Sequence, residues 1–161
     1  MAKIRKVPKK YTSGLKKGTA TKRKAEIRKR STGKVRGASK YKPLPGDKTA
    51  KTKPSKYTKS AGSLRTAVSQ SSKEVRSDST KTKFIRGAAK ATGVPTGIIR
   101  QVYERGEAAW AVGHRPGATQ AAWAKARVYS FLQKGKTAKM GDKELYTKAK
   151  KQQKGTKFRL K

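Results

Sequence analysis

Large apolar residues gather in the second half of the chain and are sparse in the first half. Between Lys83 and Leu132 they recur every three or four residues, which is the spacing of one face of an α-helix. We expect this stretch to form the only packed core of the protein. Its large apolar residues are Phe84, Ile85, Val94, Ile98, Ile99, Val102, Tyr103, Trp110, Val112, Trp123, Val128, Tyr129, Phe131 and Leu132.

Capping and stop residues set the bounds of the expected helices. Pro95 suits a first helical turn, Gly106 suits a helix end, and Thr119 can cap a following helix. A last, amphipathic helix can begin from a cap at Asp142. The expected helices cover residues 83–91, 95–105, 107–112, 120–134 and 142–149. The sequence therefore predicts a mostly α protein, whose folded part is a small domain of four or five short helices over residues 81–150.

A helix-turn-helix-like pattern lies in the run AAKATGVPTGIIRQV, residues 88–102. Ala89 is small where two helices would cross, Gly93 suits a left-handed turn, and Ile99 suits the apolar lock of the second helix. If this unit docks on DNA, the second helix enters the major groove. Four residues would then face bases or phosphates: Thr96, Arg100, Gln101 and Arg105. A helical hairpin without DNA contact is the alternative, and the spacing alone leaves both open.

The first 60 residues have a different composition. They contain no Phe and no Trp, and about half of the lysines and arginines against only two acids, Glu26 and Asp47. Such a segment cannot bury enough apolar area to offset the conformational entropy of folding. We therefore expect a basic arm over residues 1–60 that is extended or disordered when free, with one credible helix near residues 21–30. A Ser-rich, partly helical linker would follow over residues 61–80, and a basic tail over residues 151–161.

The charge of the whole chain indicates the class of partner. The 161 residues include 45 Lys and Arg but 8 Asp and Glu, so the formal net charge is +37. A balance this basic favours a polyanion. Because no long apolar run is present, we expect no membrane partner and no secretory signal. Nucleic acid is the favoured partner, and we expect DNA rather than RNA.

Catalytic and metal chemistry have little support. The chain has no Cys, which excludes disulfides, thiolate zinc sites and Cys nucleophiles. His114 is the only histidine, and the acids nearest to it in sequence, Glu104 and Glu107, lie on preceding helical pieces. We expect His114 to contact the backbone or an acidic neighbour, and Arg115 to bind either a phosphate or a helix C-terminus. We therefore expect no enzyme activity, no cofactor and no metal.

Cations of the arm are expected to follow phosphates without reading sequence, because lysine is a compact point charge and no regular spacing aims these residues at base edges. Lys-Tyr pairs place an aromatic ring beside a cation, as base stacking requires, although a lysine-rich chain also contains such pairs by chance. The arm residues expected at nucleic acid are Lys9, Lys10, Tyr11, Lys16, Lys17, Lys22, Arg23, Lys24, Arg28, Lys29, Arg30 and Arg36.

Several short runs resemble a known group of proteins. They are VYERGEAAW at residues 102–110, GHRPGAT at 113–119, WAKARVYSF at 123–131, GKT at 135–137 and DKEL at 142–145. These runs resemble a domain of uncharacterised basic proteins of tailed bacteriophages and large algal DNA viruses, and residues 6–18 resemble the basic N-terminus of the viral members. The resemblance implies a viral origin and a place in the particle. It carries over no catalytic residue.

These observations favour a non-enzymatic viral structural or nucleoprotein component that binds nucleic acid largely through phosphate neutralisation. We expect it in the virion, and in the host cytoplasm before assembly. Two alternatives stay open. A minor capsid or cement protein could lay basic arms along an acidic capsid shell, and a ribosomal-type protein could thread basic extensions through RNA. Several copies could associate within an assembly, because a thin core often gains stability from a partner.

Overall fold

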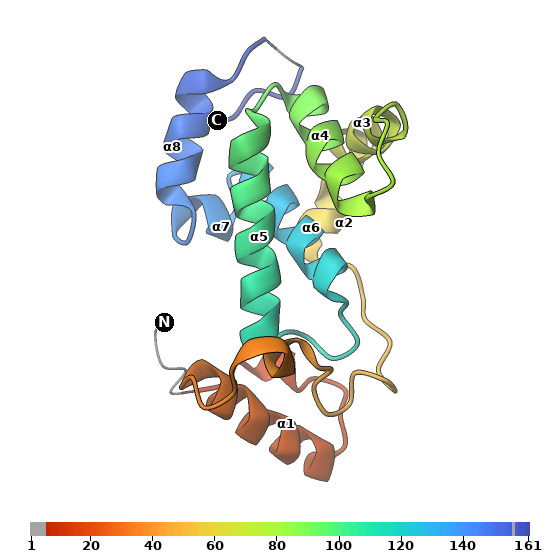
Figure 1. Cartoon of the computed structure of the whole chain (residues 1–161), viewed down its shortest axis with the longest axis vertical. Coiled ribbons are helices and arrows are strands. Elements are labelled where there is room, and N and C mark those ends of the chain that lie inside the picture. Colours follow the sequence, from red (N-terminus) through yellow and green to blue (C-terminus); the bar gives the residue numbers. More distant parts are fainter. Residues whose placement is uncertain (1–5, 156) are drawn as a thin grey trace. The chain divides into compact units, whose positions relative to one another are not determined.

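Helices make up most of the structure, a computed structural model that describes residues 6–155 and 157–161. Eight α-helices and two short 3-10 helices, and no strand, occur within these residues (Figure 1). In chain order they are η1 (Lys9–Tyr11), α1 (Lys17–Ser31), η2 (Gly37–Tyr41), α2 (Lys56–Ser60), α3 (Gly62–Lys73), α4 (Thr80–Thr92), α5 (Thr96–Val112), α6 (Gln120–Leu132), α7 (Lys136–Lys139) and α8 (Lys143–Gln152). Over the described part of the chain, no helix is both long enough and apolar enough to cross a bilayer.

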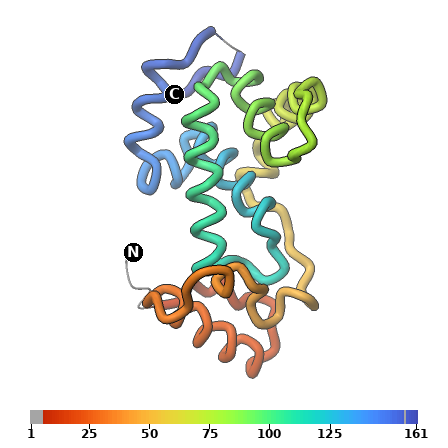
Figure 2. Tube along the Cα trace, in the orientation of Figure 1, coloured from red at the N-terminus to blue at the C-terminus, as the bar shows by residue number. Residues whose placement is uncertain are grey.

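The chain divides into two compact units, each made of two separate segments. Unit 1 consists of residues 6–53 and Glu107–Trp123, and unit 2 consists of Pro54–Gly106 and Ala124–Lys161. Helices α5 and α6 therefore each contribute residues to both units, as the continuous Cα trace shows (Figure 2). The first segment of unit 1 thus meets a partner segment that lies far away in the sequence.

Unit 1 corrects the expectation of a long extended or disordered arm, which is wrong. Helix α1, the two 3-10 helices and a turn give residues 6–53 a defined structure. The apolar core of this unit is small, with Val7, Ile27 and Leu44 buried and Tyr11 packed against them. Buried arginines add polar contacts to this small core, because the several N–H groups of one guanidinium can join several segments at once.

Unit 2 has the larger apolar core, which includes residues from α3, α4, α5, α6 and α8. Two glycines allow its helices to cross closely. A Cβ added to Gly87 on α4 would lie 2.7 Å from the Cα of Ser72 on α3, and one added to Gly106 on α5 would lie 2.7 Å from the Cα of Ala124 on α6. A side chain at either glycine would push two backbones apart.

Helix bounds confirm some expectations and correct others. Helices α4 and α6 lie where the apolar spacing places them, and the Thr119 hydroxyl caps α6 by accepting from the Ala122 N–H (3.1 Å). Helix α5 runs without a break through Gly106, where we expected one helix to end and another to begin. The reason is that Gly106 serves as a contact point with α6 rather than as a helix stop. The Ser-rich segment, expected to be a partly helical linker, contains α3.

The C-terminal residues pack onto unit 2. The Gln153 side-chain amide donates to the carbonyls of Thr92 (2.6 Å) and Phe158 (2.8 Å), and its oxygen accepts from the Leu160 N–H (3.0 Å). Leu160 is buried. The basic residues of this segment are consequently fixed on the surface of unit 2 by the apolar and polar residues between them.

Candidate nucleic-acid interface

Most acidic side chains of the protein form ion pairs with its own lysines and arginines. At least six of the eight acids take part in ion pairs within the described residues. These acids are Glu26, Asp47, Glu74, Glu104, Asp142 and Glu144. Eight acids cannot neutralise 45 Lys and Arg, so the positive charge outside these pairs faces solvent and any partner.

A tight turn in unit 1 sets the position of the most connected acid, Asp47. The Asp47 N–H donates to the Leu44 carbonyl (3.0 Å), and Gly46 has a φ of 91°. A Pro-Gly pair at the two central positions favours this turn, because proline presets its φ and glycine accepts a positive φ. The turn at Pro45 and Gly46 also directs the Asp47 carboxylate so that it accepts from the Leu44 N–H (2.7 Å).

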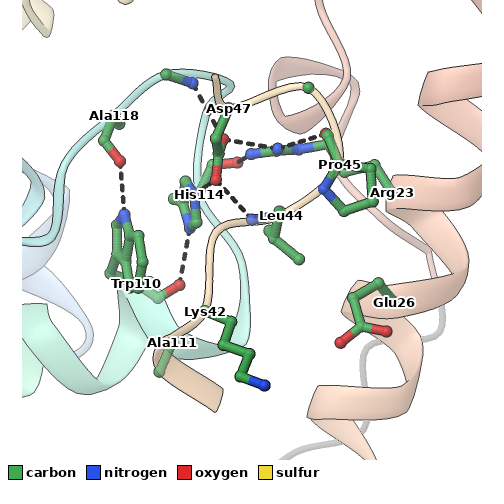
Figure 3. Close-up of polar contacts among 12 residues, drawn as sticks. Arg23, Glu26, Lys42, Leu44, Pro45, Asp47, Trp110, Ala111, His114 and Ala118 are labelled. Carbon is green, nitrogen blue, oxygen red and sulfur yellow. Dashed lines mark hydrogen bonds and ion pairs between the residues drawn. The ribbon is translucent and has the colours of Figure 1, made fainter. Parts of the chain in front are cut away.

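The Asp47 carboxylate binds groups from two distant segments of unit 1, helix α1 and the loop between α5 and α6 (Figure 3). Its Oδ1 accepts from Arg23 Nη1 (2.7 Å) and from the Gly117 N–H (3.1 Å). Its Oδ2 lies 2.8 Å from His114 Nε2. The Arg23 Nη2 also donates to the His114 carbonyl (2.8 Å), so Arg23, Asp47 and His114 form a closed buried cluster.

His114 links this cluster to Trp110. Its ring is fully buried, lies parallel to the Trp110 ring at a centroid distance of 4.2 Å, and places Nδ1 2.9 Å from the Trp110 carbonyl. A carbonyl only accepts, and so does the ionised Asp47 carboxylate at Nε2. Both ring nitrogens therefore have an oxygen partner within hydrogen-bonding distance. The expectation that His114 contacts the backbone or an acid is confirmed, but the acid is Asp47 rather than Glu104 or Glu107.

Electrostatics keeps the cluster ionised. Burial would raise the pKa of Asp47, but hydrogen bonds from His114 and Arg23, the charge of His114 and the Gly117 N–H outweigh it and lower the pKa to about 2. Burial lowers the pKa of Arg23, and the hydrogen bond and charge of Asp47 oppose this shift. Each charge in the cluster thus depends on the others.

A second buried arginine, Arg30, fastens α1 to other parts of unit 1. Its Nη1 donates to the carbonyls of Lys40 (2.7 Å) and Ala111 (3.3 Å), its Nη2 to the Lys42 carbonyl (2.9 Å), and its Nε to Glu26 (3.1 Å). Ala111 and Lys40 lie in the last turns of α5 and η2, where carbonyl groups have no partner within the helix. A planar guanidinium suits this task because its five N–H groups point in several directions.

Unit 2 contains a similar buried acid, Asp142. Arg127 donates to it through Nε (2.9 Å) and Nη2 (3.0 Å), and Arg105 donates through Nη1 (2.9 Å). Hydrogen bonds to Asp142 and then Glu144 raise the pKa of Arg105. Asp142 occupies the cap position of α8, as we expected, but its side chain makes no cap bond because both oxygens bind the arginines.

The basic residues of α1 are buried on one side of the helix and exposed on the others. Arg23 and Arg30 lie with Ile27 on the buried side, at spacings of four and three residues. The remaining basic residues of the helix are exposed, as is the preceding Lys16. These exposed residues are Lys17, Lys22, Lys24, Arg28 and Lys29. Since Arg23 and Arg30 are occupied inside unit 1, we omit both from the candidate interface and retain the exposed cations.

The other residues of unit 1 that we expected at nucleic acid differ in how far they are buried. Lys9, Lys10 and Arg36 are exposed. Tyr11 is half-buried and meets the Trp123 ring edge to face at a centroid distance of 5.9 Å, so its ring packs within the unit. Burial raises the pKa of the Tyr11 hydroxyl, and the charge of the half-buried Arg115 opposes this shift.

The helix-turn-helix-like pattern of unit 2 gives the expected turn. Gly93 has a φ of 66°, and its N–H donates to the Ala89 carbonyl (2.8 Å) at the end of α4. Thr96, Arg100 and Gln101 are exposed on the first turns of α5. Arg105 differs from them because Asp142 and Glu144 bind its guanidinium, and we omit it from the candidate interface.

Sequence reasoning missed Asp47 and Asp142 as organising residues. Asp47 lies 67 residues from His114 in the chain, so no local spacing connects them. The Pro-Gly turn directly before Asp47 was the one available signal, because a rigid turn fixes the direction of the next side chain. Within the described residues, no group of three or more His, Asp or Glu side chains could hold a metal ion.

Comparison with known proteins places the chain in a family. Residues 8–154 match a family of unknown function, DUF5824, and the chain therefore belongs to that family. No curated protein matches the sequence, and no solved structure matches the fold.

Proposed function

We propose that this protein is a non-enzymatic viral nucleoprotein component that binds DNA mainly through its phosphates. Its cations would act from a folded surface rather than from a flexible arm. The viral setting rests on the sequence resemblance given above, and the mode of binding rests on the distribution of charge over α1 and α5.

The observation that carries the proposal is the charge separation on α1. The helix has one acid, Glu26, and Arg30 binds it from the next turn (3.1 Å). The exposed basic residues Lys17, Lys24 and Arg28 follow one another at spacings of seven and four residues, which places them along one side of the helix. This side therefore offers a row of cations without a competing carboxylate of the same helix.

Folding of unit 1 supports phosphate binding in a second way. Side chains anchored on an ordered helix lose less conformational entropy on binding than those of a disordered arm. The number of phosphates that they reach is also fixed by the helix rather than by the length of the arm. Each neutralised phosphate contributes about −0.9 to the slope of log affinity against log salt on duplex DNA. Six exposed cations at α1 would thus give a slope of about −5.

Exposed polar residues on α5 supply a second contact in the proposal. Thr96, Arg100 and Gln101 lie together at the first turns of a helix that follows a glycine turn. This is the arrangement in which a recognition helix presents its N-terminal residues to base edges. We propose that α5 supplies whatever sequence preference the protein has, whereas α1 supplies affinity for any sequence.

The proposal is tested by measuring fluorescence anisotropy of a labelled duplex over a series of salt concentrations. A triple variant, Lys17→Gln with Lys24→Gln and Arg28→Gln, should weaken binding and make the salt slope less steep by about 3. The matched control is Lys148→Gln with Lys150→Gln and Lys151→Gln on α8, which removes the same charge from exposed positions of unit 2.

The control should change the slope by less than the α1 variant does. An equal loss in both triple variants would show that only total charge matters, and binding that is absent or insensitive to salt would reject the proposal. Circular dichroism of each variant at the same salt concentrations shows whether the helices are retained.

A further inference from the structure

A pocket of about 410 Å³ lies within unit 2, apart from the cations of α1. Small-molecule sites commonly measure about 300–1,000 Å³, so this pocket suits a small ligand rather than a chain. Its wall comes from the end of α2, the start of α3, the ends of α4 and α6, and the C-terminal residues. All of these segments belong to the same unit.

The lining of the pocket has two chemical parts. Ala61, Leu64 and Leu132 are buried core residues, and together with the ring of Phe158 they give an apolar surface. Four basic side chains also line the pocket, and none of its described lining residues is acidic. They are Lys134, Lys157, Arg159 and Lys161. A ligand that matches both parts has a flat or apolar body and an anionic group.

The backbone of Lys134 sets this residue apart. Lys134 has a φ of 52° and is the only residue other than glycine with a positive φ in the described chain. It follows α6 at the position where glycine is the usual residue, since glycine takes this conformation without a steric penalty. Glycine occurs one position later, where a Cβ would lie 2.5 Å from the Tyr57 ring. A lysine thus occupies a position at which glycine would be less strained, and this lysine lines the pocket.

The C-terminal wall of the pocket is fixed in place. The Tyr146 hydroxyl donates to the main-chain oxygen of Lys161 (2.9 Å), and Gln153 binds Phe158 and Leu160 through their main-chain atoms. Phe158 and Leu160 alternate with the basic residues 157, 159 and 161, so apolar side chains pack inward while the basic ones are exposed. The cations are consequently held beside the pocket by a segment that is already ordered.

We propose that this pocket binds a single nucleotide, either a free nucleoside monophosphate or the 5′-phosphorylated end of a strand. The base would lie against the apolar surface, and the phosphate would face Lys134 and the basic C-terminal residues. A planar base, whose ring faces are apolar, with a charged phosphate matches both parts of the lining. The pocket contains no residue of α1. The nucleotide proposal can therefore be tested separately from the proposed binding of DNA phosphates by the exposed cations of α1.

Binding is tested on the full-length protein by two-dimensional NMR titration with deoxyadenosine 5′-monophosphate. Deoxyadenosine alone and inorganic phosphate alone serve as the two partial ligands. The nucleotide should bind more tightly than either partial ligand and should shift the amide signals of Leu64, Leu132 and Lys134. Equal effects of inorganic phosphate and nucleotide, or shifts spread over the basic surface, would overturn the proposal.

The variant Lys134→Gly separates binding from stability. It should lower nucleotide affinity by about tenfold, the size of one charge-assisted contact, and leave the thermal midpoint unchanged or higher because glycine relieves the strained backbone. The control Lys150→Ala removes an exposed lysine of α8 outside the pocket and should leave the affinity unchanged. Unchanged affinity in Lys134→Gly would contradict the proposal.

The source of the nucleotide is distinguished by comparing short single strands with and without a 5′-phosphate, at a salt concentration that suppresses duplex binding. Tighter binding of the phosphorylated strand than of the mononucleotide assigns the pocket to strand ends, and the reverse order assigns it to free nucleotide. The α1 triple variant should bind the mononucleotide as the unaltered protein does. If it does, loss of duplex binding and loss of nucleotide binding report on different surfaces.

Discussion

Arginine and lysine have different tasks in this protein. Arg23 and Arg30 are buried, and their planar groups donate to backbone carbonyls and to an acid from several directions. The lysines of the same helix are exposed. A single ammonium group at the end of a flexible chain cannot reproduce this set of bonds, so replacement of a buried arginine by lysine is not conservative here.

Arg30→Lys tests this difference against Arg28→Lys in the same helix. Arg30→Lys should lower the free energy of unfolding by about 2–4 kcal/mol, because several buried carbonyls lose their donor. Arg28 is exposed, and Arg28→Lys should change the same quantity by less than about 0.5 kcal/mol. Urea denaturation of both variants measures the two values, and equal effects would show that burial of Arg30 has no energetic role.

The Asp47 cluster predicts a specific dependence of stability on pH. The pKa of Asp47 is about 2 in the folded protein, below the value of about 3.9 expected when unfolded. Its contribution is therefore present above about pH 4 and is lost as the pH falls through 2. Asp47→Asn should be less stable by about 3–5 kcal/mol at neutral pH, since it leaves the buried Arg23 guanidinium without its carboxylate partner.

Below pH 4, urea midpoints of the unaltered protein should fall more steeply than those of Asp47→Asn. The other acids are present in both proteins, so the difference between the two curves reports on Asp47. If the two curves are parallel, the Asp47 carboxylate has the same pKa in the folded and the unfolded protein, which would contradict the account.

At the residue scale, the sequence predicts contacts only where the signal is local. The Thr119 cap depends on neighbouring residues and is confirmed, and the turn at Pro45 and Gly46 is equally local. The pairing of Asp47 with His114 spans 67 residues, and a hydropathy pattern counts Arg23 as an exposed residue although its side chain is fully buried. These contacts could not be predicted because they depend on the tertiary fold.

At the scale of elements, an apolar stripe decides which helices can be predicted. Helices α4 and α6 have buried faces of Phe, Ile, Val and Leu, which periodicity reveals. The buried face of α1 contains two arginines and one isoleucine, so no apolar stripe marks it. The continuity of α5 through Gly106 depends on the approach of α6, which the sequence does not show.

Replacement by alanine should have opposite effects on stability at two glycines, Gly87 at the close crossing of α3 and α4 and Gly97 on an open face of α5. In Gly87→Ala the new Cβ would lie 2.1 Å from Ser72 Oγ and 2.7 Å from Ser72 Cα, so the helices must separate, at a cost of about 1–3 kcal/mol. Gly97 on α5 has nothing within 4 Å of an added Cβ, and Gly97→Ala should stabilise the helix by about 0.5–1 kcal/mol. Thermal denaturation of both variants gives the comparison, and a neutral Gly87→Ala would contradict the crossing.

At the scale of the molecule, composition indicates a polyanionic partner but does not show whether the basic first segment is folded or disordered. A net charge of +37 with 32% apolar residues favours disorder by average rules. Unit 1 departs from those rules because Asp47, Glu26 and backbone carbonyls bind its buried arginines, and because Glu107–Trp123 completes its core from elsewhere in the sequence. The exposed lysines and arginines of unit 1 take no part in these buried contacts, and they remain on the surface, where a polyanion can bind them.

The most direct measurement is hydrogen exchange of the free, full-length protein at low ionic strength, read out by mass spectrometry without nucleic acid. Amides of α1 from residues 21 to 31 should be protected, because their hydrogen bonds lie in a helix fastened by Arg23 and Arg30. Exchange of α1 at the rate of an unfolded peptide, with protection appearing only when DNA is added, would contradict a self-contained unit 1.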